Sequence, residues 1–302
     1  MNVHPELRKA ARWLPHGYHL HRGLWARRAL MNLAVRQGRL PGVPTVAVND
    51  DVRVRVHRAL GDGRGPAMLW IHGGGTIMGG AAQEDTFCRR LVNFTDVSVV
   101  SVEHRLAPEH PYPTPLNDCY AALRWIADQP WVDSERIAVG GVSAGGYFAA
   151  ALALLARDRG EIAPALQMLV HPMLDDRSGA APRQPERLMW SGRDNQIAWR
   201  WYLAGADPAG IAPARRDDLA GLPPAWIGIG SLDLFYDECL DYARRLREAG
   251  VPTTLEEVPG GFHVFDLLVP KASVSQRFFA SQVRALRTVL HAAKSPASEV
   301  SG

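Results

Sequence analysis

The chain of 302 residues is long enough to bury a large core, either as one α/β domain or as a core with a smaller appendage. Its 47% hydrophobic and 22% charged residues exclude a disordered chain, and its three widely spaced cysteines exclude a disulfide framework. No apolar run is long enough to span a bilayer, and the first residues lack the apolar core of a secretory signal. We therefore expect a cytoplasmic protein without an integral membrane segment.

The beginning of the chain is basic. Residues 1–60 carry eleven Arg or Lys and three acids, although the net charge of the whole chain is only +3. A helix within residues 19–40 would place Arg28 and Arg36 on one line and Leu30 and Leu33 elsewhere. We interpret it as a helix packed on its own protein with a solvated basic face, and contact of that face with acidic lipid is the less favoured alternative. Because no base-reading motif accompanies the charge, no nucleic-acid partner is expected.

After residue 45, strand patterns alternate with helix patterns. Strands are predicted at 45–60, 67–73, 97–105, 136–143, 165–172, 224–233 and 253–261. Helices are predicted at 116–129, 144–160 and 237–250, and a last helix follows the final strand. Strands that alternate with helices predict a parallel sheet covered on both faces, which is an α/β fold.

Residues 176–212 fit this alternation poorly. They form a long segment between two predicted strands and carry four large aromatic residues: Trp190, Trp199, Trp201 and Tyr202. Loops at the strand ends of α/β sheets carry ligand sites, and connections of this length are often functional. We therefore interpret this insertion as a lid over a binding site, rather than as aromatic residues that only pack on the core.

The sequence "RIAVGGVSAGGYF" carries the strongest chemical signal. Gly141, Ser143 and Gly145 satisfy G-x-S-x-G where a predicted strand turns into a predicted helix, which is the context that the motif requires. Ser143 must occupy a sharp, strained turn, and side chains two positions to either side would collide with the neighbouring strand and helix. We predict that Ser143 is a nucleophile.

A serine nucleophile needs a base, and the base needs an acid that holds its tautomer. Asp233 follows the predicted strand "AWIGIG", and His263 follows the next predicted strand behind two glycines. Among the eleven histidines, we single out His263 as the one in such a position. Asp237 and Glu238 are rivals for the acid, but they fall about one turn inside the following helix. We predict Ser143, Asp233 and His263 as the catalytic residues.

Three consecutive glycines follow another predicted strand, in "WIHGGGTIMGG". When a serine attacks a carbonyl carbon, the carbonyl oxygen becomes an anion and needs donors already aimed at it. Backbone N–H groups serve best where no side chain blocks the approach. We predict an oxyanion hole made by the N–H groups of Gly74, Gly75 and Ala144, and we interpret His72 as a structural residue that ties down the loop.

Several motifs together resemble those of bacterial carboxylesterases in the hormone-sensitive-lipase-like group of α/β-hydrolases. They are "HGGG", "HRLAPEHPYPTPLNDCYAALRW", "GVSAGG", "SLDLFYDE" and "GGFHVF", and the similarity spans most of residues 65–290. The resemblance implies a mostly parallel eight-stranded core at 46–175 and 213–302, and a helical cap made of 1–45 and 176–212. It also implies hydrolysis of short- to medium-chain acyl esters without a cofactor or metal, and homodimers are common in the group.

Two positions depart from the pattern of this group. Val142 stands where the group usually has Asp before the nucleophile, and His104 stands where it usually has Tyr. Neither change removes a predicted catalytic residue, but Val142 is expected to alter how the turn or the pocket is held.

Two other functions use the same residues or the same fold. One is an amidase or peptidase with the same triad, and the other is a non-catalytic ligand-binding protein. All three triad residues are present, and the chain is too short for the large extra domain that often gates such peptidases. We therefore favour an esterase that acts on a small-molecule ester.

Overall fold

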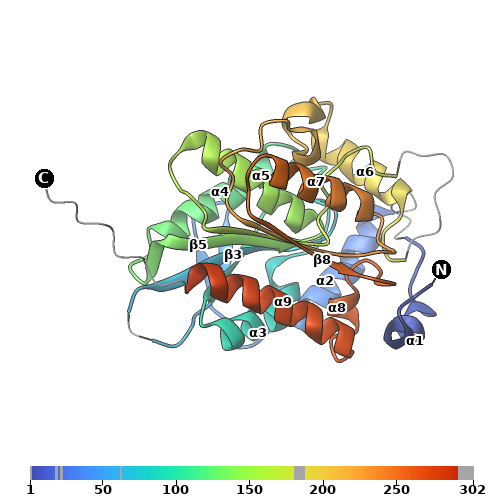
Figure 1. Ribbon diagram of the computed structural model, residues 1–302, viewed down its shortest axis with the longest axis horizontal. Coiled ribbons are helices and arrows are strands. Elements are labelled where there is room, and N and C mark those ends of the chain that lie inside the picture. The colour runs from blue at the N-terminus through green and yellow to red at the C-terminus, as the bar shows by residue number, and fades with distance from the viewer. Residues whose placement is uncertain (1, 18–19, 21–22, 62, 180–187, 292–302) are drawn as a thin grey trace, which may run out of the picture.

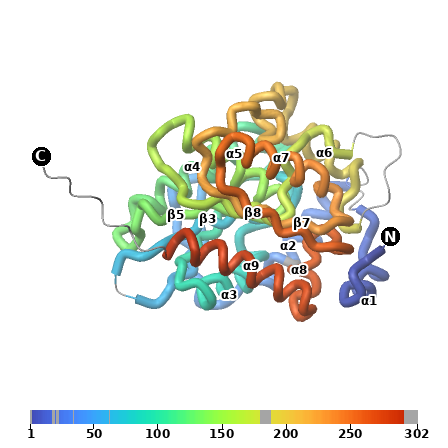
Figure 2. The backbone as a smooth tube through the Cα atoms, viewed as in Figure 1, coloured from blue at the N-terminus to red at the C-terminus, as the bar shows by residue number. Residues whose placement is uncertain are grey.

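The protein is described here from a computed structural model, which covers residues 2–17, 20, 23–61, 63–179 and 188–291 (Figures 1 and 2). The described residues form one sheet of eight strands in the order β1-β2-β4-β3-β5-β6-β7-β8. The strands are β1 (Thr45–Ala47), β2 (Arg53–His57), β3 (Gly65–Ile71), β4 (Ser98–Glu103), β5 (Val132–Val142), β6 (Leu166–Val170), β7 (Ala225–Gly230) and β8 (Thr253–Val258). β1 and β2 pair antiparallel with their neighbours and the other strands run parallel, so the predicted mostly parallel sheet is confirmed.

Helices cover both faces of the sheet. They are α1 (Arg8–Ala11), α2 (Leu24–Gly38), α3 (Asp85–Thr95), α4 (Thr114–Ala127), α5 (Ala144–Arg159), α6 (Gly192–Leu203), α7 (Tyr236–Glu248), α8 (Phe265–Leu268) and α9 (Ser273–Leu290), with short 3₁₀ turns at Pro5–Leu7, Ala81–Glu84, Pro208–Gly210 and Pro213–Arg215. In Figure 1, α4, α5 and α7 lie on one side of the sheet and α3 and α9 on the other. The predicted covering of both faces is therefore confirmed.

The core is divided by the sheet into two apolar clusters, as the side-chain alternation of a strand requires. On β3, Leu69 and Ile71 belong to the cluster that packs against α4, α5 and α7. Met68 and Trp70, on the other face of the same strand, belong to the cluster that packs against α3 and α9. Burial on both faces explains why the central strands read as continuous apolar runs in the sequence.

Helix α2 presents a different face to the protein from the one predicted. The side chain of Arg28 is only 12% exposed, because its guanidinium donates to the carbonyl oxygen of Ile77 (2.6 Å) and pairs with Glu109 (2.7 Å). Leu30 and Leu33 instead are 63% and 52% exposed. The prediction of a solvated basic face is wrong for Arg28, because a loop carbonyl and a carboxylate bind its donors on the inner side of the helix. None of the described helices is both long and apolar enough to cross a membrane.

The predicted insertion contains α6, and its residues 180–187 lie outside the described residues. Two of its aromatic residues pack on the core. The hydroxyl of Tyr147, on α5, donates to that of Tyr202 (2.9 Å), and the Trp199 ring lies edge-on to Tyr147 with ring centroids 5.0 Å apart. For Trp199 and Tyr202, core packing is therefore the correct interpretation.

Candidate active site

The predicted catalytic residues lie at the carboxyl ends of three parallel strands. Ser143 follows β5, Asp233 follows β7 by three residues, and His263 follows β8. The Nε2 atom of His263 lies 3.0 Å from Oγ of Ser143, and its Nδ1 lies 2.8 Å from Oδ2 of Asp233. All three side chains are buried. Sequence positions 90 and 30 residues apart thus form one continuous hydrogen-bonded chain.

Ser143 occupies the predicted sharp turn. Its φ is +58° and its ψ is −118°, a conformation that L-residues rarely adopt. A Cβ on Gly141 would overlap the carbonyl oxygen of Gly145, and a Cβ on Gly145 would overlap that of Ile71. The predicted collisions are therefore confirmed. α5 begins at Ala144, so its positive N-terminal end points at the serine.

The glycine loop lies against the same space. Gly73, Gly74, Gly75, Ser143 and His263 line one cavity of about 120 Å³. Here the chain admits no side chain, because a Cβ on Gly74 would overlap the Met78 carbonyl oxygen and a Cβ on Gly75 would overlap the Trp190 ring. Both glycines have positive φ, at +124° and +63°. Trp190 and Met31 also line the cavity.

Two buried groups hold this loop. The Glu84 carboxylate accepts the N–H of Gly73 (3.3 Å) and the indole N–H of Trp70. Burial raises the pKa of Glu84 above its ordinary value. Nδ1 of His72 lies 2.8 Å from the carbonyl oxygen of Gly73, and its ring stacks on His104 with centroids 4.2 Å apart. Glu84 therefore binds the Gly73 N–H, next to the two glycines predicted for the oxyanion hole.

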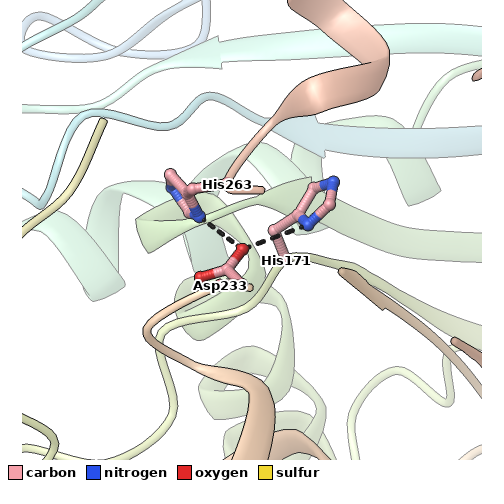
Figure 3. Close-up of side chains that lie close together, drawn as sticks. All are labelled: His171, Asp233 and His263. Atoms are coloured by element: carbon pink, nitrogen blue, oxygen red, sulfur yellow. Dashed lines mark hydrogen bonds and ion pairs between the residues drawn. The ribbon is translucent and has the colours of Figure 1, made fainter. Parts of the chain in front are cut away.

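A second histidine reaches the same carboxylate, and sequence reasoning missed it. His171 directly follows β6, and its Nδ1 lies 3.3 Å from Oδ2 of Asp233 (Figure 3). The statement that His263 alone follows a strand in this way is therefore wrong. The missed signal was the sequence "LVHP", which places a histidine at the end of a predicted strand.

His171 and Asp233 change one another's proton affinity. Burial alone would lower the pKa of His171, but hydrogen bonds and charge from Asp233 and Asp266 outweigh it and raise that pKa to about 9. Burial would likewise raise the pKa of Asp233, but the charge of His263 and the hydrogen bonds from His171 and His263 hold that pKa well below its usual range.

The rival acids are engaged elsewhere. Asp237 is exposed on α7. Glu238 is buried, but its carboxylate accepts the backbone N–H groups of Leu174 (2.5 Å) and Asp175 (3.3 Å). Neither forms a described bond with His263.

One group of described residues has the ligand types of a metal site. The ligand atoms of His171, Asp233 and His263 lie within 4.8 Å of one another. The Asp233 oxygen already lies 2.8 Å and 3.3 Å from the two histidine nitrogens that face it. Direct contacts at hydrogen-bond and ion-pair distance account for this cluster, so we interpret it as a proton-sharing group rather than a metal centre.

Comparisons with known proteins show the family of the chain. The family model described as alpha/beta hydrolase fold matches residues 68–267. Esterase LipI of Mycobacterium tuberculosis is 37% identical over 238 residues, which are 75% of this chain and 73% of LipI. Carboxylesterase NlhH of the same species is 37% identical over 242 residues, 75% of each protein.

Solved structures show the same relationship over nearly the whole chain. A bacterial heroin esterase superposes with a TM-score of 0.85 at 36% identity, covering 96% of this chain and 98% of the other. Esterase LipW from Mycobacterium marinum gives 0.85 at 35% identity, covering 96% of each.

The fold and these matches define the protein as an α/β-hydrolase. More narrowly, the chain belongs to the hormone-sensitive-lipase-like group that its motifs resemble, and it is a carboxylic ester hydrolase.

Proposed function

We propose that the protein hydrolyses short- to medium-chain acyl esters through Ser143, His263 and Asp233. The observation that carries this proposal is the hydrogen-bonded chain from Ser143 through His263 to Asp233, which opens onto the cavity beneath the glycine loop. His263 Nε2 removes the Ser143 proton as Oγ bonds to the ester carbon, and it then protonates the departing alcohol. His263 next removes a proton from water as the water oxygen bonds to the acyl carbon. It returns that proton to Oγ of Ser143 as the acyl–Oγ bond breaks, which releases the acid and restores the enzyme.

The oxyanion of each tetrahedral intermediate is assigned to the N–H groups of Gly74, Gly75 and Ala144. Support comes from the shared cavity lining of the two glycines and Ser143, and from the position of Ala144 as the first residue of α5. Donors fixed in place before the reaction need no reorganisation when the charge forms.

Gly74→Ala is expected to lower kcat by about 10²- to 10³-fold, because the new Cβ would displace the loop from the Met78 carbonyl and misdirect its amides. The measurement is kcat on an aryl ester, referred to the concentration of folded enzyme. Gly210→Ala is the matched control, since a Cβ there meets nothing within 4 Å. Equal kcat for Gly74→Ala and wild type would show that the glycine loop does not stabilise the oxyanion.

The acyl group is assigned to two neighbouring cavities. The cavity of about 120 Å³ at Ser143 and a second of about 230 Å³ share Gln83, Glu84 and Leu267 as lining residues. Phe87, Pro270 and Phe279 give the second cavity apolar walls. A short acyl chain fits the first space, and a medium chain reaches past Leu267 into the second.

Leu267→Trp is expected to narrow this passage and to lower kcat/KM for an octanoyl ester relative to an acetyl ester by about tenfold or more, because several buried methylenes would lose their contacts. The profile of 4-nitrophenyl esters from acetyl to octanoyl measures this ratio. Leu268→Trp is the control, because Leu268 is 42% exposed and lines neither cavity. An unchanged ratio in Leu267→Trp would place the acyl chain elsewhere.

Residues 1–45 and 176–212 are assigned to one cap. The N–H of Leu20 donates to Oδ1 of Asp194 (3.0 Å), and that of Met189 donates to the carbonyl oxygen of Pro15 (2.8 Å). These bonds join the two segments, and each segment supplies a wall of the Ser143 cavity through Met31 and Trp190 respectively.

A serine-reactive phosphonate tests the proposal directly. We expect one equivalent to modify Ser143, identified by peptide mass spectrometry, with loss of esterase activity in proportion. Matched ester and amide substrates with the same acyl group then separate an esterase from an amidase. Labelling of a different serine, or faster cleavage of the amide, would overturn the assignment.

A further inference from the structure

His171, next to Asp233, is held in an unusual backbone conformation. It is fully buried, its φ is +46°, and its N–H donates to the carbonyl oxygen of Gly228 (2.8 Å) on β7. Among the described residues, Ser143 and His171 are the two non-glycine residues that directly follow a parallel strand and have a positive φ. Strain of this kind persists where the surrounding structure imposes it, and it is frequent at functional sites.

The ring of His171 lies between two carboxylates. Its Nδ1 is 3.3 Å from Oδ2 of Asp233, and its Nε2 is 3.0 Å from Oδ1 of Asp266, on α8. An ionised carboxylate only accepts hydrogen bonds, and a neutral imidazole has only one N–H. Nε2 forms a hydrogen bond with Asp266, whereas Nδ1 lies at ion-pair distance from Asp233 without hydrogen-bond geometry. Both carboxylates are compensated when both ring nitrogens carry protons, so this geometry selects the imidazolium form of His171.

We propose that His171 is a positioning residue whose imidazolium cation fixes Asp233 toward His263. This inference rests on the proposed function of Ser143, Asp233 and His263. Asp233 uses Oδ1 to accept the N–H of Phe235 (3.1 Å), so its Oδ2 is shared by the two histidines. The rings of His171 and His263 lie 5.8 Å apart, measured between centroids. The charge of the His171 cation attracts this Oδ2 atom and holds it where it accepts the N–H at Nδ1 of His263.

The charges around His171 are few. The groups that face it are Asp233, Asp266 and His263, and Arg90 on α3 interacts electrostatically with Asp266. The rings of Phe265 and Phe278 cover His171 with centroids 5.4 Å away. These rings are uncharged, so the two carboxylates are the main influence on the protonation state of His171.

His171→Asn tests the role of the charge, because it removes the cation but keeps an amide donor. We expect kcat at neutral pH to fall by about tenfold while KM stays near the wild-type value, because Asp233 is then no longer held toward His263. His57→Asn is the matched control: His57 is also a buried histidine beside a carboxylate, 3.2 Å from Asp85, and it does not line the cavity. A wild-type kcat in His171→Asn would overturn the proposal.

A second test uses the wild-type protein. It depends neither on an activity assay nor on the folding of a variant. In protein carrying ¹⁵N-labelled histidine, one buried imidazole should have both nitrogens protonated at neutral pH and should titrate near pH 9. Its stabilising contribution is fully present below about pH 6.5 and is lost as the pH rises through about 9. A neutral His171 ring at pH 7 would refute the inference even if Ser143 is labelled by the phosphonate. Failure of that labelling with a protonated His171 would refute the proposed function instead.

Discussion

Replacement of Ser143 by alanine is expected to lower kcat/KM for 4-nitrophenyl butanoate by about 10⁵-fold or more, down to the level that binding and the oxyanion donors alone provide. The loss follows from the geometry, because Oγ of Ser143 is the atom 3.0 Å from the base and no acyl-enzyme forms without it. Initial rates at high enzyme concentration, after removal of contaminating esterases, measure the residual activity.

The Ser143→Ala protein should fold normally, since only one oxygen atom is removed from a turn that already tolerates a Cβ. Ser281→Ala is the matched control: it removes a buried hydroxyl on α9 that accepts from Trp226 (3.1 Å) and donates to Glu256 (2.7 Å). We expect that variant to keep wild-type kcat/KM. Wild-type turnover by Ser143→Ala would show that another nucleophile performs the reaction.

Asp233→Asn is expected to reduce kcat by about 10⁴-fold at neutral pH. The Asp233 carboxylate accepts the N–H at Nδ1 of His263, with Oδ2 and Nδ1 2.8 Å apart. Nε2 of His263 is then free to accept the Ser143 proton. The asparagine amide can donate to Nδ1 and would then select the opposite tautomer, in which Nε2 carries the proton. The base would face the serine in the wrong form.

Asp237→Asn and Glu238→Gln distinguish this acid from its rivals in the sequence. Asp237 is exposed, so its variant should keep full activity, whereas Glu238→Gln should act on stability because the carboxylate accepts two backbone amides. The measurements are kcat and the midpoint of urea unfolding for each variant. A loss of kcat confined to Asp237→Asn or Glu238→Gln would move the acid to that residue.

The parts of the fold that follow local rules were predictable. Continuous apolar strands alternating with helices predicted the parallel sheet, and G-x-S-x-G predicted a strained turn at Ser143 because only glycine fits at Gly141 and Gly145. α3 was not predicted, although Phe87 and Leu91 recur there at helical spacing and are buried. Its short pattern follows the glycine loop directly and lacks a clear start signal.

The predictions failed where contacts between residues far apart in the sequence determine how a side chain is placed. The inner face of α2 depends on acceptors for Arg28 that lie 49 and 81 residues further along the chain, and the helix itself carries no sign of them. His171 was missed for the same reason. Its two carboxylates lie 62 and 95 residues away, and only the neighbouring positions of β6, β7 and β8 in the sheet bring them to its ring.

The division of the cavity wall between strand ends and outer segments has a consequence for protein engineering. The three residues proposed for the reaction follow the ends of β5, β7 and β8, whereas Met31 and Trp190 line the same cavity from segments outside the sheet. Met31 and Trp190 can therefore be replaced to suit new substrates while Ser143, Asp233 and His263 stay in place. Substrate selectivity and catalytic rate then become separately adjustable properties of this protein.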